Sequence, residues 1–279
     1  MPALLLVLAG CTSANPEPVS LETVTSPPVS SVGSPPTARP LETGQPSEAA
    51  EPSETATGSV ESADYEVLTK DTLVPVTLAA LEKEPTAHIT MEMGTAAGFV
   101  TAQGDVRYGG ASPAMKMTIQ APGLGLGTLE MRVVDGMVYM SAPPLTPKGS
   151  YIEIDPNDPN DPYGRSFAKL PEQMDPRAAY AVFEEGLRKV TYLGQEDGLR
   201  HYRLTIDTAA VARMQGTQQV AGMPKKIPYD VWLDDRNRMT RGVMGMGSQT
   251  SMDSTYSDWG MPVNIKAPPA NRIVQQPGR

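Results

Sequence analysis

The sequence predicts an α+β fold in which one long antiparallel sheet carries a few helices on one face. Two observations lead to this class. Apolar and polar residues alternate with period two in many short segments, which is typical of half-buried antiparallel strands. Helical periodicity is confined to three places, and few helices among many strands favour helices packed on a sheet. The expected strands lie in residues 88–93, 114–120, 129–133, 138–140, 152–154, 202–206 and 229–233.

The helices are expected where capping residues precede an apolar stripe. Asp71 or Thr72 is expected to cap a helix ending at Lys83, with Pro75 near its first turn. Asp175 followed by Pro176 predicts a second helix, because a cap and a proline at the first helical position mark a helix start. Residues 208–214 predict a short third helix. Between two of the strands, Asp135-Gly136 is a hairpin turn signal.

The 279 residues divide into two parts of different composition. Residues 12–64 hold eight acidic residues, one arginine and nine prolines, without an aromatic residue. Such a segment buries too little apolar surface to order itself, so we expect residues 11–64 to be a disordered tether and residues 65–279 a folded domain. The domain is nearly neutral and has no run of basic residues, which argues against binding to nucleic acid.

Cys11 is the single cysteine, so it forms no disulfide within the chain and no thiolate zinc cluster. It ends an apolar run, and Leu8-Ala9-Gly10-Cys11 resembles the bacterial lipobox. That resemblance implies a signal peptide over residues 1–10, cleavage before Cys11, and acyl chains attached to it that anchor the protein to the membrane. No Lys or Arg precedes Cys11; a start codon upstream of Met1 would supply them.

The order of elements after the tether resembles a family. One amphipathic helix, antiparallel strands and a mid-chain helix are followed by Tyr229-Asp230-Val231-Trp232-Leu233-Asp234-Asp235 and by the segment 256–269, YSDWGMPVNIKAPP. Together with the lipobox and the tether, this order is similar to that of the LppX/LprG-type actinobacterial lipoproteins, over residues 65 to about 274.

The resemblance implies a LolA-like fold, in which a strongly curved antiparallel sheet forms a half-barrel with helices on its concave face. It also implies an apolar cavity that holds the acyl chains of a lipid or lipoglycan, a position on the extracytoplasmic face of the cell membrane, and an export partner in that membrane. It implies no catalytic residue and no cofactor.

Methionine is the residue type that fits this function. The chain has 16 methionines and three phenylalanines, and unbranched thioether side chains adapt to flexible acyl chains. The alternative for each methionine is an ordinary place in the core. Candidate cavity residues are those on the apolar phase of the expected strands: Ile89, Met91, Met93, Met115, Met117, Ile119, Leu129, Met131, Val133 and Met140. Met239, Met244 and Met246 form a second cluster with the same two interpretations.

Other chemical sites are less well supported. The Asx-rich segment Asp155–Gly164 has neither the ligand spacing nor the final glutamate of a calcium loop, so we expect successive turns. His88 and His201 lie on the polar phase of strands without a spaced partner for zinc, and we expect both at the surface. The Gly-rich segment 123–127 lies between two strands and predicts a hairpin or flap, not a phosphate loop.

Three functions remain open at this point. The first is a lipid carrier or chaperone of the cell envelope. The second is a surface-tethered binding or sensory module that has kept the fold, filled the cavity and recognises a protein partner. An enzyme is the third, and no recognisable set of acid, base and nucleophile supports it, so we expect none.

Overall fold

A computed structural model describes residues 65–95, 98–109, 113–124, 126–143, 146–161, 163–170, 174–214, 223–245 and 250–276. The expected signal peptide, the lipidated Cys11 and the tether lie outside the described residues.

The described elements follow the chain in this order. They are α2 (Lys70–Lys83), β1 (Thr86–Thr95), β2 (Gly98–Arg107), β3 (Ala114–Ala121), the 3-10 turn η2 (Pro122–Leu124), β4 (Leu126–Val134), β5 (Met137–Ser141), β6 (Tyr151–Ile154), α3 (Gly164–Phe167), α5 (Pro176–Gly186), β7 (Leu187–Glu196), β8 (Leu199–Asp207), α6 (Thr208–Met214), β9 (Lys226–Leu233), β10 (Met239–Gly245), β11 (Ser251–Ser257), η3 (Ala270–Arg272) and β12 (Ile273–Val274).

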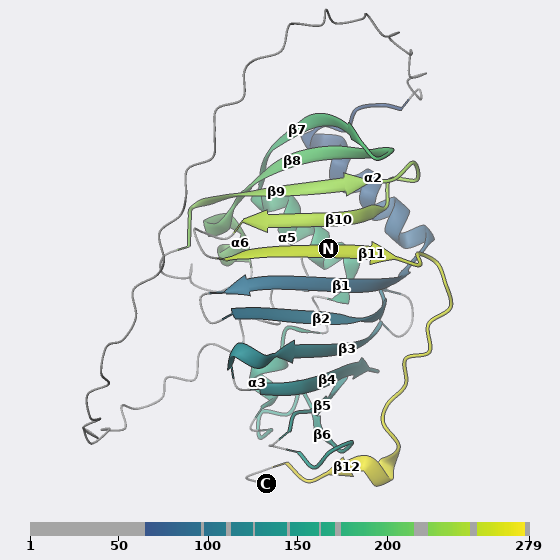
Figure 1. The fold of residues 1–279 in the computed structure, drawn as a ribbon, viewed down its shortest axis with the longest axis vertical. Coiled ribbons are helices and arrows are strands. Elements are labelled where there is room, and N and C mark those ends of the chain that lie inside the picture. Colours follow the sequence, from purple (N-terminus) through teal and green to yellow (C-terminus); the bar gives the residue numbers. More distant parts are fainter. Residues whose placement is uncertain are drawn as a thin grey trace, which may run out of the picture. The chain divides into compact units, whose positions relative to one another are not determined.

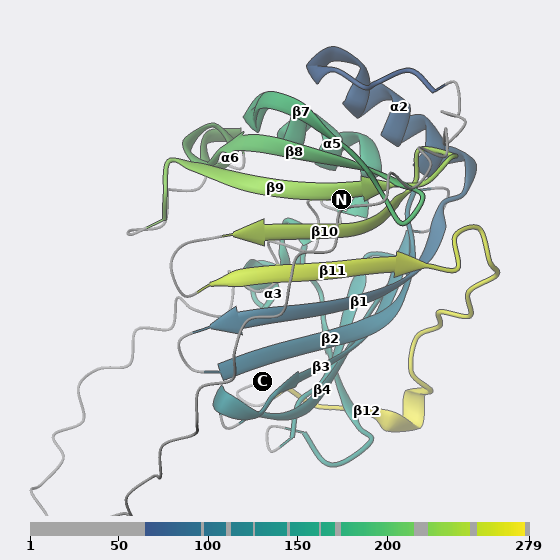
Figure 2. The ribbon, with the colours of Figure 1, turned by 45° about the horizontal axis from the view of Figure 1, so that its top comes forward.

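The strands form one twelve-stranded sheet in the order β12-β6-β5-β4-β3-β2-β1-β11-β10-β9-β8-β7 (Figure 1). Two antiparallel meanders, β1 to β6 and β7 to β11, are joined where β1 pairs antiparallel with β11. The sheet is curved and unclosed (Figure 2), because its two edges are β7 and β12 rather than a closing pair. The predicted α+β class with a curved antiparallel sheet is therefore confirmed.

Helix α2 begins earlier than the sequence suggests. Its cap is Thr69, not Asp71 or Thr72, and the backbone amide of Thr69 donates a 2.8 Å hydrogen bond to the hydroxyl of Thr72. Since the helix starts at Lys70, Pro75 lies inside it rather than in its first turn. Leu73, Val74, Thr77 and Leu81 form its buried stripe.

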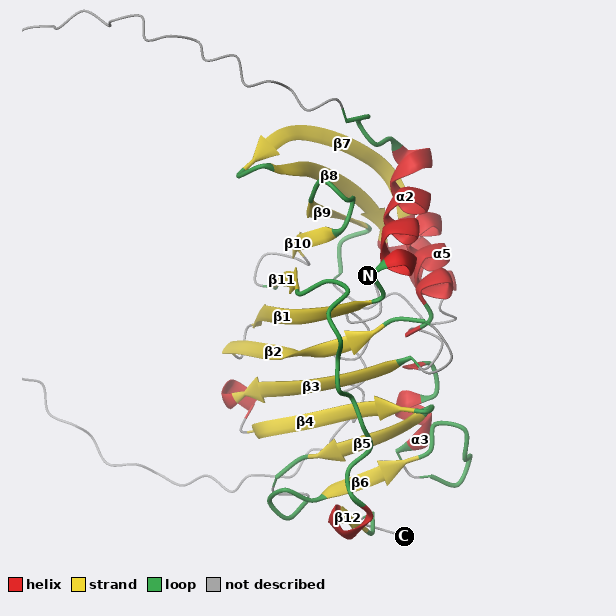
Figure 3. Ribbon diagram, turned by 90° about the vertical axis from the view of Figure 1, so that its right-hand side faces the viewer, coloured by secondary structure: helices red, strands yellow, loops and turns green. Residues whose placement is uncertain are grey.

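Helix α5 starts as predicted. Oδ1 of Asp175 accepts a 3.0 Å hydrogen bond from the backbone amide of Arg177, and Pro176 occupies the first helical position. The helix packs against α2 and α6. Figure 3 shows α2 and α5 on one side of the sheet, next to β7 to β11, while α3 lies on the same side next to β4 and β5. This side is called the inner face below.

The C-terminal segment runs from β11, in the middle of the sheet, to the edge at β6, where β12 pairs in parallel with β6 (Figure 2). Along its course Ile265 is buried, and the carbonyl of Lys266 accepts a 3.2 Å hydrogen bond from the guanidinium of Arg132. At its end, the side-chain amide of Gln276 donates to the carboxylate of Asp161 and to the carbonyl of Glu153. The last residues thus become part of the sheet edge.

Candidate functional site

The cross-strand register places the predicted cavity residues in adjacent rows on the inner face. The first row continues through β11 and β1 to β6, the second through β1 to β6, and the third through β11 and β1 to β4. Their members are Tyr256, Ile89, Gly104, Met117, Met131, Met140 and Ile152 in the first row, Ala87, Val106, Met115, Val133, Val138 and Ile154 in the second, and Ser254, Met91, Ala102, Ile119 and Leu129 in the third.

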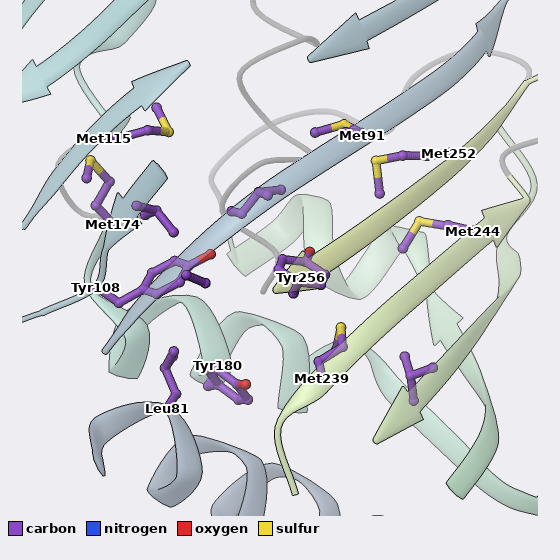
Figure 4. Packing of buried hydrophobic residues seen from close by; sticks show 14 of the residues in the cluster. Leu81, Met91, Tyr108, Met115, Met174, Tyr180, Met239, Met244, Met252 and Tyr256 are labelled. Atoms are coloured by element: carbon purple, nitrogen blue, oxygen red, sulfur yellow. The ribbon is translucent and has the colours of Figure 1, made fainter. Parts of the chain in front are cut away.

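The tenth candidate, Met93, lies in a fourth row next to the third. Its partners are Val100 on β2 and Met252 on β11, and Met252 in turn faces Met244 on β10. Figure 4 shows Met91, Met252 and Met244 on neighbouring strands of this surface. The register therefore brings all ten candidates to one continuous surface, which Met244 and Met252 extend into the second meander.

Burial along these strands is graded. Ile89 and Met91 are 1% and 2% exposed, as are Met117 and Met115 on β3, and all four belong to the core. Met131 and Val133 on β4 are equally buried, and Ile119 and Met140 are half-buried against the same core.

The half-buried residues Met93, Ile119 and Leu129 lie in the third and fourth rows. Each lies near the edge of the sheet where the β1–β2 and β3–β4 connections are found, and Ile119 and Leu129 are direct cross-strand partners. Their neighbours Val100, Ala121 and Met252 are buried, so partly accessible apolar side chains alternate with buried ones near this edge. We call it the open end, and the opposite edge, with the Asp135-Gly136 turn, the closed end.

Strand β2 presents the shortest inner-face side chains. Val100, Ala102, Gly104 and Val106 alternate along it, between the methionines of β1 and β3. Gly104 is required by the close approach of β3, because a Cβ atom at this position would stand 1.9 Å from the carbonyl oxygen of Lys116. The inner-face side chains of β2 therefore extend less far from the sheet than those of β1 and β3.

No charged side chain lies on the inner face of the described parts of β1 to β6. Their charged residues, such as Glu92, Lys116 and Glu130, fall on the other phase of the strands. The surface can contact hydrocarbon without leaving a charge unpaired. It offers an acyl chain apolar contact and no ionic partner.

Four buried tyrosines form the polar part of the interior, under α2 and α5. Burial raises the pKa of Tyr108, Tyr180, Tyr229 and Tyr256, in the case of Tyr180 to about 12. The nearby phenols raise the pKa values of Tyr108, Tyr180 and Tyr229 further, which shows that the four lie close together. Figure 4 shows three of these rings on β11, on α5 and at the end of β2.

Three of these hydroxyls have identified hydrogen-bond partners inside the domain. That of Tyr229 donates to the sulfur of Met239 at 3.4 Å, and that of Tyr180 shares a hydrogen bond with the hydroxyl of Thr77. The hydroxyl of Tyr256 shares one with Ser254. The cluster is uncharged at neutral pH, because every raised pKa keeps the phenol protonated.

The two histidines lie on the outer face. His88 accepts or donates a 2.8 Å hydrogen bond with Asp105, and its side chain is 37% exposed, as expected of a surface histidine. His201 differs from the expectation, since its side chain is only 17% exposed. Its ring stacks on Trp232 with centroids 4.2 Å apart, and Arg241 covers the same tryptophan at 5.0 Å. Sequence alternation identified the face but not this stack.

The Asx-rich segment forms successive turns. Asp155 and Asp158 each accept a hydrogen bond from the backbone amide two residues on, and Asp161 accepts from Tyr163 and Gly164.

Within the described ranges no group of three His, Cys, Asp or Glu side chains is placed to hold a metal ion. The helices that the structure describes include none long and apolar enough to span a bilayer. In the Gly-rich segment, Gly123 and Leu124 end η2 between β3 and β4, as predicted, whereas Leu126 and Gly127 already belong to β4.

No family model matches the sequence, and no curated protein matches it either. Among solved structures, the crystal structure of Mycobacterium tuberculosis lipoprotein LppX is similar, with a TM-score of 0.47, 17% identity, and coverage of 70% of this chain and 96% of that one. LprF from Mycobacterium bovis is similar with a TM-score of 0.49, 20% identity, and coverage of 71% and 96%.

Proposed function

We propose that this chain is an extracytoplasmic lipoprotein, lipidated on Cys11, whose domain binds the acyl chains of a lipid or lipoglycan and carries or presents them in the cell envelope. The single observation that carries this proposal is the inner face of β1 to β6. It is continuous, uncharged in its described part and rich in methionine, and it includes the half-buried side chains of Met93, Ile119 and Leu129 near the open end.

The chemistry of the surface favours hydrocarbon over other ligands. Met91, Met115, Met117 and Met131 have flexible, polarisable side chains that follow the irregular contour of an acyl chain. Between them, Ala102 and Gly104 on β2 present small side chains to the inner face. A catalytic role is not part of this proposal, and the lipobox-like segment 8–11 supports a membrane anchor.

The main alternative is a binding module whose interior is filled by its own side chains. The two functions make opposite predictions for Ala102, which lies 7% exposed at the centre of β2. If an acyl chain occupies the space above β2, Ala102→Phe displaces it and the fold tolerates the ring. If protein side chains fill that space, the same substitution overpacks the core and costs about 1–3 kcal/mol of stability.

The experiment uses the full chain with Cys11→Ser, produced with a signal peptide, so that it meets envelope lipids without an acyl anchor. Native mass spectrometry followed by solvent extraction is expected to find bound lipid, and Ala102→Phe to remove it while the melting temperature changes little. Gln103→Phe is the matched control, because Gln103 is the next residue on the same strand and faces solvent. A lipid-free protein strongly destabilised by Ala102→Phe would instead identify the packed binding module.

A further inference from the structure

We propose that the open end of the sheet docks directly on an anionic membrane surface, through a rim formed by Phe99, Arg213, Met214, Lys225 and Lys226. The topology brings these residues to one edge although they come from three parts of the chain. Phe99 follows the β1–β2 connection, Arg213 and Met214 end α6, and Lys225 and Lys226 precede or begin β9. Figure 1 shows α6 and the starts of β2 and β9 on the same side of the sheet.

The rim joins exposed apolar and basic side chains. Phe99 and Met214 are 71% and 52% exposed, which is unusual for such large apolar residues. Arg213, Lys225 and Lys226 are also exposed, and none of them lies within 4.0 Å of a carboxylate in the described part of the chain. A surface binds anionic bilayers when its apolar side chains enter the headgroup region and free cations lie beside them.

Charge is distributed unevenly between the two ends of the sheet. Beyond the row of Met93, the described strand ends and connections at the open end also carry Lys148, Arg188 and Lys189, and their acidic residues are Glu184, Glu185 and Asp207. Asp207 is already paired with Arg188 at 3.2 Å. Glu92, Glu130 and Asp253 lie further along the strands, and Asp253 is paired with Arg241. Basic residues therefore outnumber acidic ones among the described residues at the tip of this end.

The closed end has the opposite sign. Its turns contain Asp135, Asp197, Asp235 and Asp258, all exposed. Two of its cations, Arg236 and Arg238, both bind Glu84. Three of these aspartates have positive φ, so their identity also suits the turn. The result is a domain whose acidic end is repelled by an anionic surface while its basic end is attracted.

Docking in this orientation places the accessible residues Met93, Ile119 and Leu129 against the bilayer. An acyl chain can then pass between the membrane and the inner face with little exposure to water. Binding of the rim to the membrane does not depend on a bound lipid, because the rim residues lie outside the inner face. This binding can be measured on a lipid-free protein.

The test is sedimentation of the full Cys11→Ser chain with vesicles of phosphatidylcholine alone or mixed with phosphatidylglycerol. Binding is expected only to the mixed vesicles and should weaken as salt rises. Each lysine near such a surface contributes about fivefold, so Lys225→Gln with Lys226→Gln is expected to weaken binding on the order of 25-fold. The matched control, Lys70→Gln with Lys266→Gln, removes the same charge from two exposed lysines elsewhere and should change binding little.

A second measurement locates the contact. The Cys11→Ser chain contains no other cysteine, so Met214→Cys can carry a polarity-sensitive fluorophore alone. Its emission is expected to rise and shift to the blue on mixed vesicles, whereas the label at Met261→Cys, 57% exposed beside the closed end in the native protein, should not respond. Equal responses at both sites, or equal losses in the two double-lysine variants, would overturn the proposal without bearing on whether the interior holds lipid.

Discussion

The side-chain amide of Gln276 donates a 2.8 Å hydrogen bond to Oδ2 of Asp161, and both residues are buried. The same carboxylate accepts hydrogen bonds from the backbone amides of Asp155, Tyr163 and Gly164. One side chain therefore organises the turns after β6 and also binds the end of the chain.

Asp161→Asn is expected to lower the free energy of unfolding by about 1–3 kcal/mol at neutral pH, because an amide cannot accept all of these hydrogen bonds. Burial by itself raises the pKa of Asp161, but the hydrogen bonds outweigh burial and the net pKa is lowered. The stabilisation is thus complete above about pH 4, the ordinary pKa of the unfolded side chain, and is lost as pH falls through the lowered value. Denaturant unfolding between neutral and acidic pH should show the two proteins converging in acid. Asp158→Asn, at a neighbouring turn with fewer hydrogen bonds, should cost less.

Gly104→Ala is expected to destabilise the domain by at least about 2 kcal/mol, since the added methyl group meets the backbone of β3 and no side-chain rotation relieves the overlap. Gly127→Ala on β4 provides the comparison, because nothing lies within 4 Å of its added Cβ atom. Thermal unfolding measures both. Similar melting temperatures for the two variants would mean that β2 and β3 are not held as closely as described.

Titration with base tests the buried tyrosine cluster. Burial raises the pKa values of Tyr108, Tyr180, Tyr229 and Tyr256, so these four phenols should stay neutral above pH 10, the ordinary pKa of a tyrosine being about 10. A pKa raised by folding contributes stability that is complete below about pH 10 and is lost as pH rises further, through about 12 for Tyr180. Absorbance near the phenolate band, followed together with circular dichroism, should show these four phenols ionising only as the domain unfolds. Ionisation of all tyrosines in one step before unfolding would contradict the buried cluster.

The elements with a strong local pattern could be predicted from sequence. Strands β3 and β4 alternate cleanly, and the Asp175-Pro176 start of α5 was found because the cap and the proline act within a few residues. The predicted start of α2 was wrong because two threonines, Thr69 and Thr72, offer competing caps. The hydrogen-bond geometry selects the earlier one.

Two of the strands that the sequence did not reveal have inner faces that are small or partly polar. Strand β2 presents Ala102 and Gly104 to the interior, and β11 presents Ser254 between Met252 and Tyr256, so neither shows strong apolar alternation. Strand β7 is an edge strand with many exposed residues, and β12 depends entirely on its pairing with β6. For this reason Met252 and the tyrosine cluster were absent from the predicted site: their place follows from the pairing of β1 with β11, which joins segments about 170 residues apart.

That pairing also imposes an order of assembly on the folding chain. Within each meander, every strand meets the one before it, so β1 to β6 can assemble from short loop closures as the chain emerges. The pairing of β1 with β11, which sets His88 opposite Ser257, needs a much later part of the chain. The pairing of β12 with β6, which sets Ile273 opposite Tyr151, comes later still. The methionine surface of the first meander is consequently complete before the second meander, with its helices and edge, exists to adjoin it. During that interval its apolar side chains have no second meander to pack against.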